Sequence, residues 1–219
     1  MRQLLTGWPP RAEQPTPPGA DIAHLWSVAL DVSDARLRVL AETLTEAERE
    51  RAARLLSPLA CIRWIAARGS LRELLGAYLD CPPAAVAIDS DELGKPYLRS
   101  TDSVPPHFSV SRSRSLMLVG LTRSTPIGVD VEAIDRPQIF LEHWTAKEAY
   151  LKAIGVGLRQ HPPRVDLKAP MRNASTEVEL APTALPAPWL LARLAPCDGY
   201  VGAAVVNAAI RRFSCHRWP

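Results

Sequence analysis

The sequence lacks the features that mark several large classes of protein. No apolar run approaches the roughly 20 residues that a membrane-spanning helix needs, and Arg2 is not followed by the apolar segment of a secretory signal. The 4 cysteines form no CxxC pair and are widely spaced, which indicates neither a zinc site nor a disulfide framework. We therefore expect a protein of the reducing cytoplasm that does not associate with a membrane.

A surplus of one charge is also missing. The formal net charge is only +3, which is too small to indicate nucleic-acid binding, although local basic clusters could bind phosphates. The 5 histidines are dispersed, and neither a Walker loop nor a kinase-type glycine loop is present. What the chain does have is 219 residues that are 47% hydrophobic, enough for one large domain or two small lobes.

The pattern of elements predicts an α+β protein. A capping box of Thr45 and Glu48 begins one helix, and Ser57-Pro58 begins a longer one that ends before Pro82. A third helix is expected over residues 137–154, where Gly155 is well placed to end it. Alternating apolar runs predict short strands at 24–30, 86–89, 97–98, 107–111, 116–121, 127–132, 177–180, 189–194 and 200–206.

The order of these elements favours two lobes that meet near residues 123–127. The N-terminal lobe would span residues 1–124 and begin with a proline-rich arm over residues 1–20. The C-terminal lobe would span residues 125–219 and contain the last predicted helix.

Chemistry is concentrated between Gly128 and Gly157. Asp130 and Glu132 are two residues apart on a predicted strand, so their carboxylates project from one face. Glu148 and Lys152 are four apart on a helix and also share a face. If the two elements pack together, three hard oxygen ligands converge, a set that suits magnesium. On spacing alone, solvated charges at a strand end and on an exposed helix are the alternative interpretation, and spacing by itself favours it.

Several segments in this region and upstream of it resemble one family. They are GVDVE at 128–132, WTAKEAYLKA at 144–153, GKPYL at 94–98, HFSVSRS at 107–113, ERERAARLL at 48–56 and DGYVGAAVV at 198–206. In sequence and order they resemble the motifs of the 4′-phosphopantetheinyl transferases. The length is similar to the monomeric two-lobe type, and the resemblance implies two similar α/β lobes related by a pseudo-twofold axis, with the active site in the cleft between them.

This resemblance implies an enzyme. It would transfer the phosphopantetheine arm of coenzyme A to a serine of an apo acyl or peptidyl carrier protein, giving holo-carrier and 3′,5′-ADP. Asp130, Glu132 and Glu148 would bind magnesium, or manganese, against the pyrophosphate. Glu148 would also act as the base for the serine hydroxyl, and Lys152 would stabilise the leaving phosphate.

The resemblance also implies which side chains contact coenzyme A. The family's nucleotide contacts fall at Arg51, Lys95, Ser111 and Arg112, with Arg63 and Lys147 as further candidates. The alternative for any one of them is an ordinary surface cation, since the chain contains 26 lysines and arginines. Lys95 lies between Gly94 and Pro96, where a rigid turn would orient its side chain.

The chain departs from the family pattern at two places. Arg112 stands where the family has histidine, and arginine can still bind a phosphate bidentately. Only residues 136–143 separate Asp135 from Trp144, where the family has a longer insert that helps dock the carrier. We expect Trp144 to pack its helix onto the sheet, and Gly128 to allow close backbone approach beside Asp130.

Two other functions are compatible with these residues. The chain could bind coenzyme A or a carrier protein and transfer poorly because of the shortened segment. It could also be another magnesium-dependent phosphotransferase that uses a nucleotide, although no nucleotide-binding loop of the usual kinds is present.

Overall fold

The computed structural model of the chain describes residues 8–10, 15–92, 94–99, 105–155, 177–179 and 189–219. In chain order the elements are β1 (Ile22–Ala29), α1 (Asp34–Glu42), α2 (Glu46–Ala53), α3 (Pro58–Leu79), the short 3₁₀ helix η1 (Pro83–Ala85), β2 (Ile88–Ser90), β3 (Pro96–Leu98), β4 (His107–Ser113), β5 (Leu116–Thr122), β6 (Ile127–Ala133), α4 (Gln138–Ile154), β7 (Glu177–Glu179), β8 (Trp189–Leu194), β9 (Tyr200–Asn207) and β10 (Arg212–Trp218).

The described residues form two main sheets and a small ribbon. One sheet has the strand order β4-β5-β1-β10-β7, in which β1 and β10 are parallel and the other pairs antiparallel. The second sheet has the order β6-β9-β8 and is antiparallel throughout. Strands β2 and β3 form the ribbon. The predicted α+β class is therefore confirmed.

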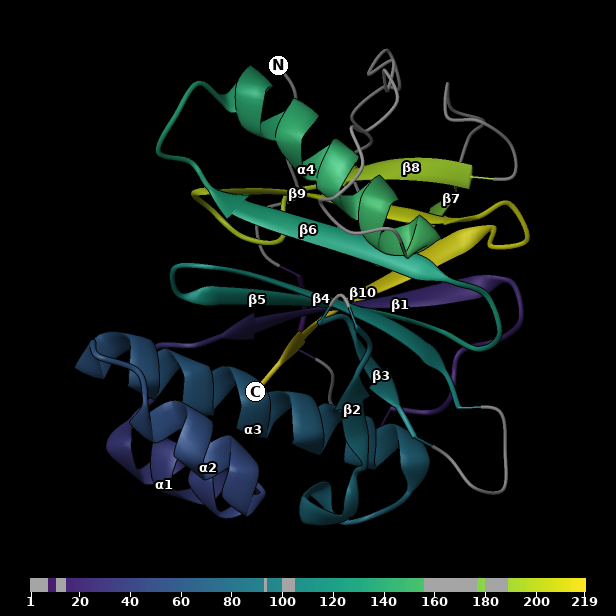
Figure 1. The fold of residues 1–219 in the computed structure, drawn as a ribbon. Coiled ribbons are helices and arrows are strands. Elements are labelled where there is room, and N and C mark those ends of the chain that lie inside the picture. Colours follow the sequence, from purple (N-terminus) through teal and green to yellow (C-terminus); the bar gives the residue numbers. More distant parts are fainter. Residues whose placement is uncertain (1–7, 11–14, 93, 100–104, 156–176, 180–188) are drawn as a thin grey trace.

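The elements stack in four layers, helices outside and sheets inside (Figure 1). Between the sheets lies one apolar core that contains Leu25, Leu118, Val129 and Phe213. A second core lies between the five-stranded sheet and α1 and α3. A third lies between α4 and the three-stranded sheet.

The strands divide their side chains between these cores with period two. In β1, Ala23 and Leu25 face the other sheet, whereas Trp26 and Val28 face the helices. Because both faces of the strand are covered, it reads as an almost unbroken apolar run rather than as an alternating one.

Besides the short η1, one helix and one strand were not predicted from the sequence. Helix α1 begins at the N-cap Ser33, whose hydroxyl accepts a hydrogen bond from the backbone of Arg36. Strand β10 lies parallel to β1, with Phe213 opposite Ala23 and Cys215 opposite Leu25. The last strand of the chain therefore completes the sheet that the first strand begins.

Helix α4 packs unusually close to β6. A Cβ atom at Gly128 would lie 1.9 Å from the carbonyl oxygen of Ala149 and 2.4 Å from the nitrogen of Ala153. Only glycine can stand there without moving the helix, which confirms the predicted close approach. The helix ends as expected at Gly155, which has φ of 78°.

The remaining expectations stand as follows. The other predicted helices and strands are present with shifts of a few residues, and the shortened segment 136–143 runs into the first turns of α4. Much of the proline-rich arm, Leu180 and Gly157 lie outside the described residues. The division into lobes at residue 124 stays a prediction. Strand β10, which falls in the predicted C-terminal lobe, pairs with β1, which falls in the predicted N-terminal lobe.

Candidate active site

Asp130 and Lys152 form the centre of the site. Because Gly128, Asp130 and Glu132 alternate on β6, all three face α4, and the helix presents Lys152 to the strand. The ammonium of Lys152 donates to Oδ1 of Asp130 at 2.8 Å and to the carbonyl of Val129 at 3.1 Å. The predicted convergence of these two side chains is therefore observed.

The two carboxylate oxygens of Asp130 differ in their hydrogen bonds. Its side chain is buried, and Oδ1 also accepts a hydrogen bond from the hydroxyl of Ser111 at 2.7 Å. Among the residues that the structure describes, no group bonds Oδ2. A buried carboxylate oxygen without a partner is costly, so this atom is suited to a ligand such as a cation.

Serines of β4 hold the strand that carries the acids. Ser109, Ser111 and Ser113 alternate along β4 and face β6. The hydroxyl of Ser109 accepts from the backbone N–H of Val129, and that of Ser113 accepts from the N–H of Ala133, both at 3.1 Å. Ser113 also donates to Oε2 of Glu132 at 2.7 Å. These hydroxyls satisfy the free edge of β6 and orient both of its carboxylates.

Glu148 lies one turn before Lys152 on α4 and is half-buried. Burial and the neighbouring charges of Asp130 and Glu132 raise the pKa of this carboxyl, and the ammonium of Lys152 opposes them. The three acids therefore influence one another electrostatically. A divalent cation would relieve this repulsion.

The fit of the site to a metal ion is partial. The unpartnered Oδ2 of Asp130 and the mutual repulsion of the acids fit a hard cation. However, within the described part of the chain, no three acidic, histidine or cysteine side chains are arranged to hold an ion together. Lys152 bonds Asp130 and Ser113 bonds Glu132, so one oxygen of each carboxylate is already in use.

A cavity of about 900 Å³ opens beside this centre. Its walls come from α2, α3, the η1–β2 segment and β4, and it extends to Ser111 and Lys152, the two partners of Asp130. Six basic side chains and two acidic ones line it, and the basic ones are Arg51, Arg68, Arg72, Arg99, Arg112 and Lys152. Such a cavity is suited to an anion that carries several charges.

Arg51 and Arg112 are the cations of this cavity without an acidic partner among the described residues. Burial lowers the pKa of the Arg112 guanidinium, and the like charges of Arg51 and Arg68 lower it further. Three arginines that repel one another in one cavity are stabilised by an anion between them. Two of the three are predicted contacts to coenzyme A.

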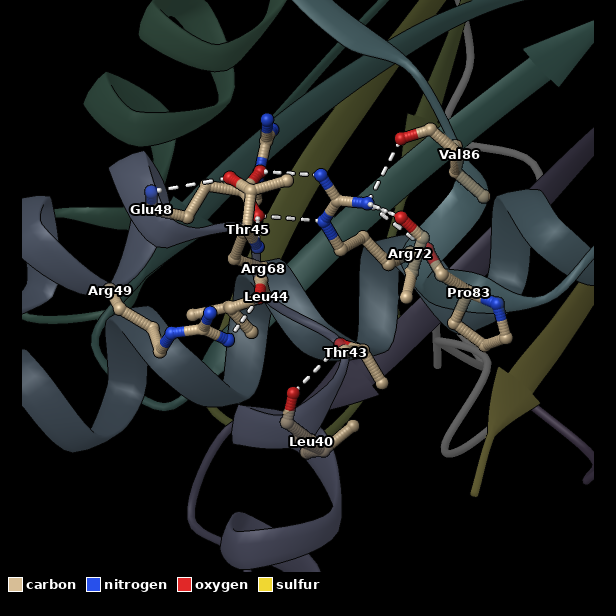
Figure 2. Close-up of polar contacts among 11 residues, drawn as sticks. Leu40, Thr43, Leu44, Thr45, Glu48, Arg49, Arg68, Arg72, Pro83 and Val86 are labelled. Carbon is tan, nitrogen blue, oxygen red and sulfur yellow. Dashed lines mark hydrogen bonds and ion pairs between the residues drawn. The ribbon is translucent and has the colours of Figure 1, made fainter.

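Figure 2 shows the network that joins the cavity walls around Glu48. Oε2 of Glu48 accepts from the backbone of Thr45 at 2.9 Å, which completes the predicted capping box of α2. Arg68 donates to Oε1 and Arg72 to both carboxylate oxygens. Arg72 is 2% exposed and also donates to the carbonyls of Pro83 and Val86.

Three predicted contacts to coenzyme A do not line this cavity. Both nitrogens that Arg63 uses bond the carboxylate of Asp31, and Arg63 is not among the residues that line the cavity. Lys95 donates to the carbonyl of Lys152 at 2.6 Å, at the end of α4, and lines a smaller cavity of about 240 Å³. Lys147 also lies outside the cavity lining.

The expectation for Trp144 is wrong. Its side chain is 42% exposed, and its ring stacks on that of Phe140, which is 48% exposed, at a centroid distance of 6.4 Å. The small side chains of Ala146, Ala149 and Ala153 pack against the sheet instead. The close approach at Gly128 leaves room for alanines on that face and not for an indole ring.

Arg68, Arg72 and Ser113 are site residues that the sequence did not single out. Ser113 lies in the motif HFSVSRS and two residues after Ser111, so strand periodicity could have placed it on the acidic side. The two arginines lie four apart on α3, and their partner Glu48 belongs to the capping box of another helix. No local pattern indicates that pairing.

An α+β fold in which a basic cavity reaches Ser111 and Lys152, the two partners of Asp130, indicates a class of protein that binds a phosphorylated ligand. Comparison with known proteins narrows this class. Residues 132–205 match the family model of the 4′-phosphopantetheinyl transferase superfamily. The chain is 32% identical over 226 residues to 4′-phosphopantetheinyl transferase HetI of Nostoc sp., with 88% of this chain and 92% of HetI covered.

Two more distant relatives agree. The L-aminoadipate-semialdehyde dehydrogenase-phosphopantetheinyl transferase of Eremothecium gossypii is 29% identical over 36% of this chain and 40% of its own. The 4′-phosphopantetheinyl transferase gsp of Aneurinibacillus migulanus is 25% identical over 45% and 54%. The chain belongs to the 4′-phosphopantetheinyl transferase superfamily.

Proposed function

We propose that this chain transfers the 4′-phosphopantetheine arm of coenzyme A to a serine of an apo acyl or peptidyl carrier protein, giving holo-carrier and 3′,5′-ADP. The main support is the position of the basic cavity, which extends to Ser111 and Lys152, the two groups that hold Asp130. A polyphosphate ligand in this cavity would have its charges among the arginines and its reacting phosphate beside the carboxylates.

Arg51 and Arg112 would bind the 3′-phosphate of coenzyme A. Both line the cavity, and neither has a carboxylate partner in the described part of the chain. Arginine at position 112 stays charged at any physiological pH and presents parallel donors to phosphate oxygens. Lys95, Arg63 and Lys147 contribute less on this geometry, because other groups hold the first two and none lines the cavity.

Asp130, Glu132 and Glu148 are the side chains that would hold a magnesium or manganese ion. Bound there, such an ion neutralises charge on the pyrophosphate and on the departing 3′,5′-ADP. Ser111 and Ser113 orient two of the three acids before the ion binds. Lys152, which donates to Asp130, would also donate to a phosphate oxygen of the ligand.

The transfer itself would proceed as a direct displacement at phosphorus. Glu148 accepts the proton of the carrier serine, and the serine Oγ forms a bond to the β-phosphorus of coenzyme A. The bond from this phosphorus to the bridging oxygen breaks, and 3′,5′-ADP leaves with the electron pair. The pKa of Glu148, raised by burial and by Asp130, makes its carboxylate a better proton acceptor than a solvated glutamate.

A binding module that holds coenzyme A or a carrier without transfer is the second candidate, favoured only by the shortened segment between Asp135 and Trp144. We further propose that the chain acts as a cytoplasmic monomer. None of the described helices is both long and apolar enough to cross a membrane.

Intact-mass measurement of a panel of apo-carrier proteins tests this proposal. With coenzyme A and magnesium, a carrier should gain the mass of one phosphopantetheine group, and EDTA should prevent the gain. The panel should include fatty acid, polyketide and nonribosomal peptide carriers, since docking without the longer insert is expected to narrow the range of carriers. Coenzyme A binding without any mass gain across the panel would favour the binding module instead.

A further inference from the structure

Arg68 has the contacts of a side chain held in place for a ligand. Its Nε donates to Oε1 of Glu48, and it lines the cavity. Among the described residues, no protein group bonds its two terminal nitrogens. The four N–H donors of these nitrogens are therefore available, although the side chain as a whole is only 19% exposed.

Arg72 differs from Arg68 in this respect. Its Nε and Nη2 both bond Glu48, and its Nη1 bonds the carbonyls of Pro83, Ala84 and Val86. All three of its nitrogens are in use, which makes it a structural tie between α2, α3 and η1. Glu48 therefore bonds two different arginines (Figure 2). Every nitrogen of Arg72 has a partner, whereas the terminal nitrogens of Arg68 have none among the described residues.

Arg68 forms one group of cations with Arg51 and Arg112. All three line the same cavity, from α3, α2 and β4. Arg68 and Arg51 are both near enough to Arg112 to repel it electrostatically. Glu48 can neutralise only one of its two arginines, so the group around it keeps a positive charge that faces the cavity.

We propose that Arg68 is a further phosphate-binding residue of the cavity, which contacts the 3′-phosphate of coenzyme A together with Arg51 and Arg112, and that Glu48 is its positioning residue. This inference rests on the proposed function for the identity of the ligand. Glu48 fixes the side-chain torsions of Arg68 through Nε and leaves both terminal nitrogens available for a phosphate. A pre-oriented guanidinium loses less entropy on binding than a free one.

Calorimetric titration of the full chain with coenzyme A and with dephospho-coenzyme A tests the role of Arg68. Arg68→Met should weaken coenzyme A binding by about one to two decades, as expected for a lost charge-assisted contact. It should change dephospho-coenzyme A binding by less than about twofold, because that ligand lacks the phosphate. Arg36→Met is the matched control, since Arg36 of α1 bonds Glu73 of α3, the helix that carries Arg68, and lies outside the cavity lining.

Glu48→Gln tests the positioning role. Glutamine retains the capping box of α2 but weakens the hold on Arg68, so coenzyme A affinity should fall while dephospho-coenzyme A affinity does not. In the transfer assay, KM for coenzyme A should rise with kcat unchanged. The double variant Glu48→Gln/Arg68→Met should lose no more than Arg68→Met alone, because Glu48 acts through Arg68. Glu73→Gln, which removes the charge that holds Arg36, is the control.

The outcomes distinguish a failure of the roles given to Arg68 and Glu48 from a failure of the proposed transferase function. Equal affinity of wild type and Arg68→Met for coenzyme A, or equal losses on both ligands, would overturn the role of Arg68. Additive losses in the double variant would overturn the positioning role of Glu48. If the wild type binds coenzyme A through Arg68 but modifies no carrier, the inference stands and the transferase proposal fails. A wild type that binds neither ligand contradicts both.

Discussion

Glu48 shows how one buried residue can serve structure and binding together. Burial opposes ionisation of its carboxyl, but hydrogen bonds from Arg72, from the backbone of Thr45 and from Arg68 outweigh burial, so its pKa lies below its ordinary value of 4.5. The ionised form is therefore the one that the fold stabilises. Removing one partner would leave the others buried without compensation.

The pH dependence of stability should show this coupling. A carboxyl whose pKa is lower in the folded state stabilises the fold fully above its unfolded pKa, and this contribution is lost as the pH falls through the folded pKa. We expect wild type to have a higher Tm than Glu48→Gln at pH 7, and the difference to narrow as the pH falls below about 4.5. Thermal unfolding followed by circular dichroism between pH 7 and pH 3 measures it. A difference that does not change with pH would show that Glu48 contributes no such charge effect.

The positions of the acidic side chains follow from the sequence more directly than those of the basic ones. Asp130 and Glu132 follow strand periodicity, Glu148 and Lys152 follow helix periodicity, and a family signature contains all four. Arginines on a helix have no such pattern. Arg63 and Arg68 are five residues apart on α3, yet one bonds Asp31 and the other lines the cavity. Their partners come from distant segments, and only the tertiary structure identifies them.

At the scale of elements, the site depends on how closely α4 approaches β6. Asp130 lies on the strand and Lys152 on the helix, and their 2.8 Å contact requires the two backbones to be close. Gly128 and the alanines of α4 allow that approach. The packing of the two elements therefore sets the geometry of Asp130 and Lys152.

Gly128→Ala should disturb both stability and activity. The added Cβ would lie 1.9 Å from the carbonyl oxygen of Ala149, so α4 must move away from β6 and take Lys152 with it. We expect a loss of about 1–3 kcal/mol in the free energy of unfolding, as for other overpacked sites, and a marked fall in transfer rate. Urea denaturation and the intact-mass assay measure the two effects.

Gly19→Ala is the control for this substitution. A Cβ at Gly19 would meet its nearest neighbour at 3.5 Å, an ordinary contact, and the atoms within 4 Å of it belong to Asp21 and Ile22. It should change neither quantity by a measurable amount. Wild-type stability and activity for Gly128→Ala would contradict the role given to the close approach.

Strand β10 was missed because its sequence, RFSCHRW, has no turn or capping signal and mixes charged with apolar residues. The alternation of Phe213 and Cys215 with polar residues is a strand pattern, but it is short and ends the chain. Its parallel pairing with β1 joins residues that are almost 200 positions apart, at Ile22 and Arg212. Local sequence does not determine a pairing of that range.

At the scale of the whole molecule, four layers bring distant parts of the chain to one cavity. Helices α2 and α3 contribute arginines, β4 contributes Ser111 and Arg112, and α4 contributes Lys152. The acids of β6 lie where the two sheets meet, held by serines of the neighbouring sheet. A ligand that reaches from the arginines to the acids would contact α2, α3 and β4 at one end and β6 and α4 at the other.

The central claim is that Asp130 and its neighbours form the catalytic centre of a transferase. The most direct test is the initial rate at which Asp130→Asn and wild type convert an apo-carrier to the holo form with coenzyme A and magnesium. Asp135→Asn is the control, because Asp135 is an exposed acid that bonds Arg114 outside the cavity lining. The account predicts a loss of about a hundredfold or more for Asp130→Asn, the effect of removing one charge-stabilising group, with near wild-type folding and a wild-type rate for the control. A folded Asp130→Asn that modifies the carrier at the wild-type rate would contradict it.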